Sequence, residues 1–208
     1  MNVNTVRQTI AGPAGAIECA IDLPAVDPRG TAILCHPHPQ HGGTLDNKVV
    51  QTLARAFVQL GWRSVRFNFR GVGASQGAWD DGVGEIDDTL AVIAAHRAVA
   101  EPFMLAGFSF GAYVASHAAA RLPDDAKPRR MVLVGASTLR QPMANVPGDT
   151  VVIHGETDDV VPLAATLAWA RPQALPVIVF PGVGHFFHGQ LGMLKNWVVQ
   201  ELQPRMPL

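Results

Sequence analysis

Cysteine and long hydrophobic runs are both scarce in this chain of 208 residues. Its two cysteines, Cys19 and Cys35, match neither the spacing of a metal site nor that of a redox pair. No run reaches the roughly 18 apolar residues that a membrane-spanning helix needs. The first residues also lack the basic start and apolar core of a signal peptide. The sequence therefore predicts a cytoplasmic protein with no membrane partner, and nothing in it calls for a disulfide.

Charge is sparse as well as balanced. Charged residues make up 16% of the chain, and the formal net charge is -1. This balance gives no electrostatic reason to expect a nucleic acid as a partner. The glycine-rich motifs that bind phosphates or dinucleotides are missing, so no cofactor is expected. With 48% hydrophobic residues the composition is that of a globular protein, and the length favours a single domain over residues 1–208.

Apolar runs alternate with helical patterns along most of the chain. The predicted strands are residues 32–35, 64–69, 103–108, 131–135, 151–153 and 177–180, and the predicted helices are residues 47–60, 85–100, 111–121, 163–170 and about 191–202. An earlier pair of segments, 5–10 and 16–23, predicts a hairpin at a sheet edge. Asp46 is the expected N-cap of the first helix. The alternation implies an α/β three-layer sandwich, with parallel strands and helices on both faces.

The sequence Gly-Phe-Ser-Phe-Gly at residues 107–111 lies where a predicted strand meets a predicted helix. A serine on such a sharp turn projects its hydroxyl from a strained backbone, and the flanking glycines remove Cβ atoms that would clash. Ser109 is therefore the candidate nucleophile. The alternative is an ordinary strand-to-helix turn whose serine caps the helix.

A serine nucleophile needs a base, and the base needs an acid that orients it. Asp158 and Asp159 follow one predicted strand, and His185 and His188 follow the next. Both places lie beyond the carboxyl ends of parallel strands, where open α/β sheets hold their sites. We expect His185 to be the base because it comes first after the glycine turn. The residues alone leave the choice between the two aspartates open.

Acyl transfer also needs hydrogen-bond donors for the oxyanion. The backbone N–H of Phe110, directly after Ser109, is one candidate. The other is expected in the loop after residues 32–35, where Pro37 and Pro39 have no N–H to give. The backbone N–H of His38 is therefore the second candidate.

The same loop also raises an alternative chemistry. His36, His38 and His41 lie within six residues of one another, and His154 is a fourth candidate ligand. A metal-dependent hydrolase is therefore an alternative, although the main interpretation places no metal in the site.

Four segments of the chain carry a family resemblance: CHPHPQHGGTLDNKVV from Cys35, RFNFRGVGASQGAWDDGVGE from Arg66, GFSFG from Gly107, and HGETDDVVP together with GHFFHG towards the end. In combination they resemble the small, lidless α/β-hydrolases related to dienelactone hydrolases and small carboxylesterases. The resemblance implies the α/β-hydrolase fold, with a mostly parallel sheet of about seven or eight strands and no cap domain. It aligns Asp158 with the acid and His185 with the base. Dienelactone hydrolases use a cysteine nucleophile, so their specific reaction is not carried over to Ser109.

Three aromatic residues are candidates for the wall of an acyl pocket, with core packing as the alternative: Trp79, Phe186 and Phe187. Arg70 is expected to pair with Asp81 or Glu85 and so to hold its loop.

These features together predict a carboxylesterase-like serine hydrolase. It would cleave ester or thioester bonds of small acyl substrates through an acyl-enzyme on Ser109. A binding protein with a silent site on a hydrolase fold is the competing prediction from another class. A small acyl molecule is the expected partner, and the sequence leaves a homodimer open.

Overall fold

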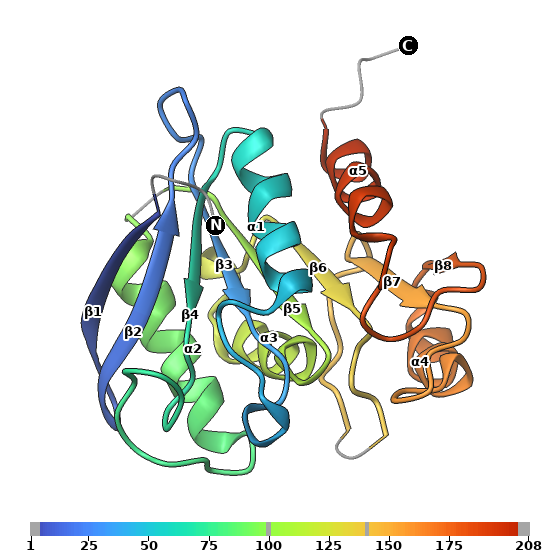
Figure 1. Ribbon diagram of the computed structural model, residues 1–208, viewed down its shortest axis with the longest axis horizontal. Helices are drawn as coiled ribbons and strands as arrows, with labels where there is room; N and C mark the ends of the chain where they lie inside the picture. Colours follow the sequence, from blue (N-terminus) through green and yellow to red (C-terminus); the bar gives the residue numbers. More distant parts are fainter. Residues whose placement is uncertain (1–4, 99–100, 140–141, 204–208) are drawn as a thin grey trace.

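A single eight-stranded sheet runs through the molecule, in the order β1-β2-β4-β3-β5-β6-β7-β8 (Figure 1). The structure, a computed structural model, describes residues 5–98, 101–139 and 142–203. The strands are β1 (Val6–Gly12), β2 (Gly15–Asp22), β3 (Thr31–Cys35), β4 (Arg63–Phe67), β5 (Phe103–Phe108), β6 (Arg130–Val134), β7 (Val151–Gly155) and β8 (Val177–Phe180). Strand β2 pairs antiparallel with both β1 and β4. The remaining pairs, β4–β3, β3–β5, β5–β6, β6–β7 and β7–β8, are parallel. The prediction of a mostly parallel sheet of about seven or eight strands is confirmed.

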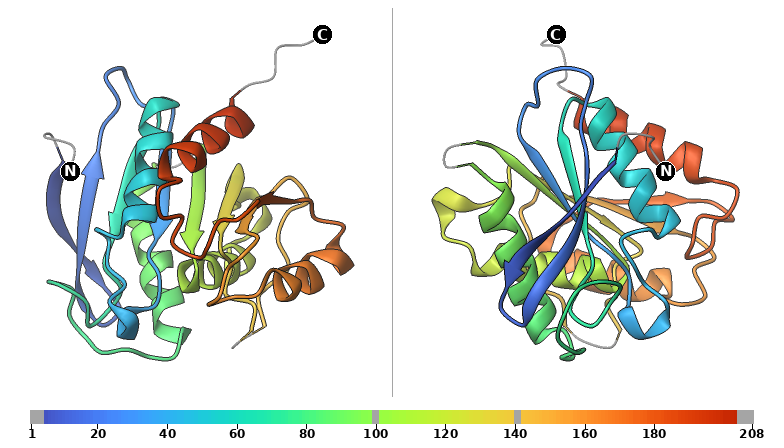
Figure 2. Two further views of the ribbon diagram at one scale, coloured as in Figure 1. Left: turned by 45° about the vertical axis from the view of Figure 1, so that its right-hand side comes forward. Right: turned by 60° about the vertical axis from the view of Figure 1, so that its left-hand side comes forward.

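Helices cover both faces of this sheet (Figures 1 and 2). They are α1 (Lys48–Gln59), α2 (Val83–His96), α3 (Phe110–Arg121), α4 (Leu163–Ala170) and α5 (Leu191–Leu202), with short 3₁₀ turns η1 (Pro39–His41), η2 (Asp124–Ala126) and η3 (Arg171–Gln173). Helices α1 and α5 pack on one face, and α2 and α3 pack on the other. None of the described helices has both the length and the apolar character needed to cross a membrane.

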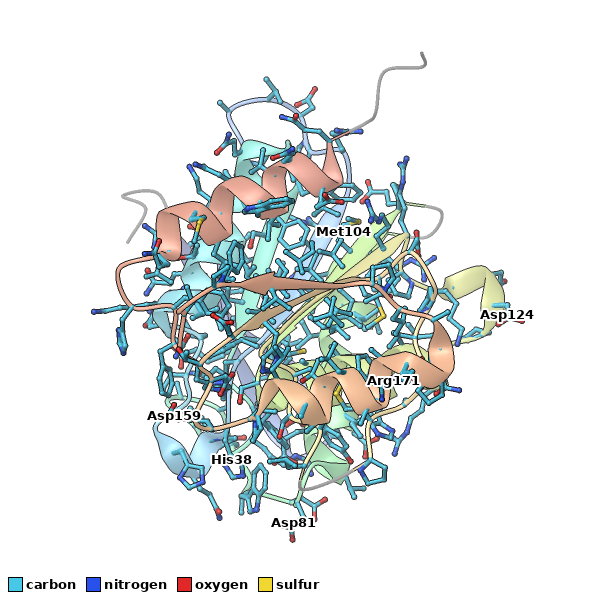
Figure 3. All side chains as sticks on the ribbon, turned by 90° about the vertical axis from the view of Figure 1, so that its right-hand side faces the viewer. His38, Asp81, Met104, Asp124, Asp159 and Arg171 are labelled. Atoms are coloured by element: carbon cyan, nitrogen blue, oxygen red, sulfur yellow. The ribbon has the colours of Figure 1, made fainter. Side chains whose placement is uncertain are left out.

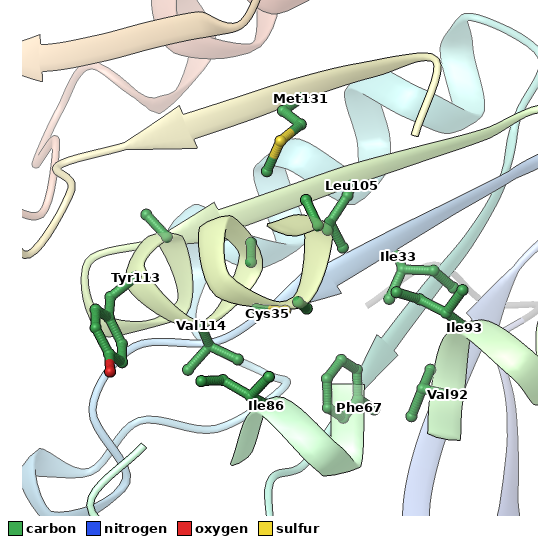
Figure 4. Packing of buried hydrophobic residues seen from close by; sticks show 14 of the residues in the cluster. Ile33, Cys35, Phe67, Ile86, Val92, Ile93, Leu105, Tyr113, Val114 and Met131 are labelled. Atoms are coloured by element: carbon green, nitrogen blue, oxygen red, sulfur yellow. The ribbon is translucent and has the colours of Figure 1, made fainter. Parts of the chain in front are cut away.

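The central strands are apolar on both sides, as buried parallel strands are expected to be. All five residues of β3 are buried, and Ile33, Leu105 and Val114 meet in the cluster beneath α2 and α3 (Figure 4). Cys35 belongs to the same cluster, and burial raises the pKa of its thiol to about 12. Both cysteines are free and buried, and Cys35 packs as a small hydrophobic residue.

Two predicted helix ends differ from the structure. Helix α1 is capped by Asn47, whose side chain accepts hydrogen bonds from the N–H groups of Val49 (2.9 Å) and Val50 (3.4 Å). Asp46, the predicted cap, instead forms ion pairs with arginine side chains of β1 and β4. The helix predicted over residues 85–100 ends at His96, and residues 99–100 lie outside the described part of the chain. Asp46 is thus used for tertiary contacts rather than for the local turn.

Arg70 is held by a carboxylate, but not by either of the predicted partners. Its Nε and Nη2 atoms donate to the two oxygens of Asp88 at 3.0 and 2.8 Å, and its backbone N–H donates to the same carboxylate at 2.9 Å. Glu85 is unavailable to Arg70 as a direct partner because it accepts the N–H groups of Asp80 and Gly82 at the start of α2. The Arg70–Asp88 pair therefore fixes the loop after β4 onto helix α2.

We expect Asp88→Ala to lower the free energy of unfolding by about 3–5 kcal/mol, because Asp88 is fully buried and its loss leaves the Arg70 guanidinium with only the exposed carboxylate of Asp80, 3.7 Å away, as an ion-pair partner. Asp87→Ala is the matched control on the same helix. It removes an ion pair with Arg121 that is about half exposed on both sides, and such pairs contribute about 0–1 kcal/mol. Urea unfolding of both variants measures the difference, and equal losses would contradict a structural role for the Arg70–Asp88 pair.

Candidate active site

The candidate nucleophile lies on a strained turn between β5 and α3. Ser109 has φ 56° and ψ -118°, a conformation that a residue with a Cβ rarely adopts. A Cβ at Gly107 would overlap the carbonyl of Gly111, and a Cβ at Gly111 would overlap the carbonyls of Cys35 and His36. The Ser109 side chain makes no capping bond to α3, so the alternative of a simple helix cap is wrong.

Three side chains form a continuous hydrogen-bonded chain at this turn. Ser109 Oγ lies 3.0 Å from His185 Nε2, and His185 Nδ1 lies 2.6 Å from Asp158 Oδ2. All three residues are at least nine-tenths buried. Because an ionised carboxylate can only accept hydrogen bonds, Nδ1 carries the hydrogen and donates a hydrogen bond to Asp158. Nε2 is then free of hydrogen and can accept the proton of the serine hydroxyl.

The second oxygen of Asp158 organises its own loop. Asp158 Oδ1 accepts the backbone N–H groups of Val160 (2.9 Å) and Val161 (2.7 Å). Burial works to raise the pKa of Asp158, but the hydrogen bonds from His185 and from Val161 outweigh it and hold that pKa below its usual value. Asp159 is exposed (Figure 3), as is His188. Of the two candidate pairs, the structure thus brings Asp158 and His185 to Ser109.

The loop after β3 carries the second candidate donor to the oxyanion. The carbonyl of His38 accepts the N–H groups of His41 (3.1 Å) and Gly43 (3.0 Å), which closes the loop into a tight turn. Phe110 begins α3, so its N–H has no carbonyl within the helix to bind. Phe110, His38, Ser109 and His185 all line one cavity. Both residues that carry the candidate donors therefore lie at the cavity that holds Ser109.

The cavity at Ser109 is open to solvent and measures about 510 Å³. Its mouth is apolar: Leu139, Val160 and Phe186 all line it and all have large exposed surfaces. Phe187, which the sequence also places in the pocket wall, is instead fully buried and packs against Phe180 in the core. Trp79 does not line this cavity but an adjoining one.

Comparison with known proteins identifies the family and the fold of the chain. Residues 27–147 match the family described as serine aminopeptidase, S33. The chain belongs to this family of α/β serine hydrolases. It is 39% identical to an α/β serine hydrolase homologue from Coxiella burnetii, with 95% of this chain and 97% of the other covered and a TM-score of 0.84. It is 35% identical to a lidless α/β serine hydrolase from Xanthomonas campestris, with 100% and 99% covered and a TM-score of 0.88.

A curated relative of this hydrolase is an uncharacterised protein of Rickettsia prowazekii, 38% identical over 116 residues. The match takes in 54% of this chain and 49% of the Rickettsia protein, so it spans about half the length of that relative.

In this hydrolase a second histidine, His154, lies next to the carboxylate of Asp158. His154 Nε2 is 2.8 Å from the carbonyl oxygen of Val161 and 3.3 Å from Asp158 Oδ2, and its Nδ1 is 3.2 Å from the hydroxyl of Thr166. Burial lowers the pKa of His154, so at neutral pH it is uncharged and Nε2–H is a donor. The sequence offers His154 only as a metal ligand. Its position in the HGETDD segment, four residues before Asp158, was the available signal for this contact.

A third buried histidine braces the loop of the candidate oxyanion donor. His36 Nε2 accepts the N–H of Phe69 at 3.0 Å, and Nδ1 lies 2.6 Å from the carbonyl oxygen of Pro37. Both ring nitrogens are therefore engaged by the backbone. Among the described residues no group of three or more His, Cys, Asp or Glu side chains is arranged to hold a metal ion. The histidines of the metal-dependent alternative do not form a common site.

We expect the burial of His36 to lower the free energy of unfolding of the hydrolase in acid. Burial lowers the pKa of His36 from 6.5 to about 4. As the pH falls below 6.5, His36 becomes protonated in the unfolded chain but stays neutral in the folded chain. The free energy of unfolding therefore decreases between about pH 6.5 and pH 4. The total is about 3 kcal/mol, and the lowered pKa values of His96 and His154 add to the same slope.

Urea unfolding at pH 7, 6 and 5 tests this expectation with His36→Asn, whose amide can still donate to Pro37. The variant should be less stable at pH 7 but lose less stability on acidification than the wild-type protein. His188→Asn, at an exposed position, is the control and should keep the wild-type slope. Parallel slopes for His36→Asn and wild type would show that His36 is not the group concerned.

Proposed function

We propose that this hydrolase cleaves ester or thioester bonds of small acyl substrates through an acyl-enzyme on Ser109. The observation that carries the proposal is the unbroken hydrogen-bond chain from Ser109 through His185 to Asp158, at the edge of an open cavity. A serine hydroxyl is a poor nucleophile on its own, and this arrangement gives it a base within hydrogen-bond reach.

In the first half of the reaction, His185 Nε2 takes the hydroxyl proton as Ser109 Oγ attacks the acyl carbon. The oxyanion that forms is stabilised by the N–H groups of Phe110 and His38 and by the positive end of α3. Collapse of the tetrahedral intermediate breaks the bond to the alcohol or thiol, which leaves with the proton held on His185.

In the second half, a water molecule repeats these steps. His185 takes one proton from the water, and the hydroxide adds to the acyl carbon of the acyl-enzyme. Collapse frees the acid and returns the proton to Ser109. Throughout, Asp158 keeps the imidazole in the tautomer that leaves Nε2 without hydrogen, and stabilises the imidazolium when it forms. Side chains of this chain and water account for every proton, so the scheme needs no cofactor.

A peptidase acting at a free amino terminus is the second candidate, because the family is described as serine aminopeptidase. Binding of an α-ammonium group inside a cavity calls for a carboxylate partner. Among the described residues, none of those lining the cavity at Ser109 is aspartate or glutamate, and Asp81 in the adjoining one already accepts the indole N–H of Trp79. The apolar mouth formed by Leu139, Val160 and Phe186 instead favours a neutral acyl or alkyl group. Parallel assays with short-chain acyl esters and with aminoacyl amides separate the two candidates.

Ser109→Ala should abolish ester hydrolysis and labelling by a fluorophosphonate probe while the thermal melting curve stays close to that of the wild-type protein. The reason is that the hydroxyl contacts His185 but makes no capping bond that the fold needs. Wild-type protein that resists the probe, or an alanine variant that keeps the wild-type rate, would remove Ser109 from the proposed role.

Asp158→Asn should reduce kcat by about 10⁴, the loss known when the orienting carboxylate of a serine protease is changed to an amide and the histidine takes the wrong tautomer. Asp159→Asn is the matched control one residue further along. Its side chain is exposed, so the variant should keep the wild-type rate. Steady-state assays on an activated ester measure both, and an inactive Asp159→Asn beside an active Asp158→Asn would move the acid by one residue.

A further inference from the structure

A second chamber adjoins the cavity at Ser109 and plays no part in the scheme above. It measures about 200 Å³ and shares three lining residues with the larger cavity, namely His38, Phe110 and Ser137. The rest of its wall is formed by Gln40, Trp79, Asp81 and Tyr113. The two hollows therefore meet at the candidate oxyanion donors, beside the carbon that Ser109 would attack.

Four rings line this chamber, those of His38, Trp79, Phe110 and Tyr113, beside the polar side chains of Gln40, Asp81 and Ser137. The Trp79 ring lies 4.6 Å from that of His38 and 5.1 Å from that of Phe110, centroid to centroid. Phe110 in turn stacks with Tyr113 at 5.8 Å. Ring faces of this kind suit another aromatic ring, which gains from offset or edge-to-face contacts beyond its buried area.

Trp79 is held in place before any ligand arrives. Its indole Nε1 donates to Asp81 Oδ1 at 3.1 Å, and its ring packs against the core cluster beneath α2 and α3. Figure 3 shows His38 and Asp81 at the same end of the molecule, where the loops after β3 and β4 come together. A wall that is already ordered loses little conformational freedom when a ligand binds.

The chamber is large enough for an aromatic ring. An apolar cavity of about 150 Å³ is enough to hold benzene. The chamber of about 200 Å³ thus has room for one six-membered ring with a small substituent.

The position of His185 decides which part of the substrate enters this chamber. The leaving group must lie within reach of His185, which returns its proton. His185 and Phe186 line the larger cavity and do not appear in the wall of the aromatic chamber. The leaving group therefore occupies the larger cavity, and the acyl group, which stays on Ser109, is the part that extends past Phe110.

We propose that the chamber bounded by Trp79 and Tyr113 is an acyl subsite for a single aromatic ring. The preferred substrates are then esters of monocyclic arylalkanoic acids, of which phenylacetyl and 3-phenylpropanoyl esters are the simplest. This assignment rests on the proposed ester hydrolysis at Ser109 and adds the class of acid to it.

Vinyl esters that share one small leaving group provide the test: acetate, phenylacetate and 3-phenylpropanoate, with acid release followed by a pH indicator. For wild-type protein, kcat/KM should be about tenfold or more higher for the two phenyl esters than for acetate. Trp79→Ala should reduce the ratio of phenylacetate to acetate by about tenfold, and Trp79→Phe, which restores a ring, should recover most of it.

Val83→Ala is the control, because Val83 is exposed two residues after Asp81 and lines neither cavity. It should keep the wild-type ratio and rates. An unchanged ratio in Trp79→Ala would overturn the subsite.

A second comparison, of phenyl acetate with ethyl acetate, tests the direction. If Trp79→Ala lowers the preference for the aromatic leaving group instead, the acyl assignment is wrong. Failure of the proposed function looks different: wild-type protein would then cleave none of these esters and would not react with fluorophosphonate.

Discussion

The close approach of helix α3 to the carboxyl ends of β3 and β5 is the constraint on which the candidate site depends. Only glycine at positions 107 and 111 leaves room for it, because a Cβ at either position would meet backbone carbonyls. The short path from β5 into α3 forces Ser109 into a left-handed conformation. The strain has a use, since it turns the hydroxyl towards His185 and leaves the first N–H of α3 beside it.

The parallel sheet then brings the remaining groups to the same edge. Strands β3, β5, β7 and β8 point the same way, so the loops that follow them lie together although more than a hundred residues separate the first from the last. Buried polar groups in such a place need partners. Asp158 finds them in His185, in two backbone N–H groups and in the neighbouring His154, while His36 ties the loop after β3 to the end of β4. Two neutral histidines, His36 and His154, thus support the site in which His185 is placed to transfer protons.

No cap domain lies over the site in the described part of the chain, so the loops themselves shape the space around Ser109. The loops after β6, β7 and β8 supply the apolar mouth of the larger cavity, and the loop after β4 supplies Trp79 for the smaller one. The Arg70–Asp88 pair holds that last loop against α2. Selectivity for a substrate is then a property of a few side chains on anchored loops, which makes it separable from the chemistry at Ser109.

Strand and helix positions, the turn at Ser109 and the order of the candidate acid and base all follow from local sequence. Apolar runs, glycine spacing and chain order are local signals of what a segment must form. Tertiary structure decided the rest, because it assigns each polar or aromatic side chain to one of several competing partners. Asn47 rather than Asp46 caps α1, because the carboxylate of Asp46 forms ion pairs with arginines from two strands. Arg70 reaches Asp88 because Glu85 caps α2. Phe186 lines the cavity while its neighbour Phe187, with φ 53°, turns into the core. Such choices depend on which segments fold against one another, and spacing along the chain does not contain that information.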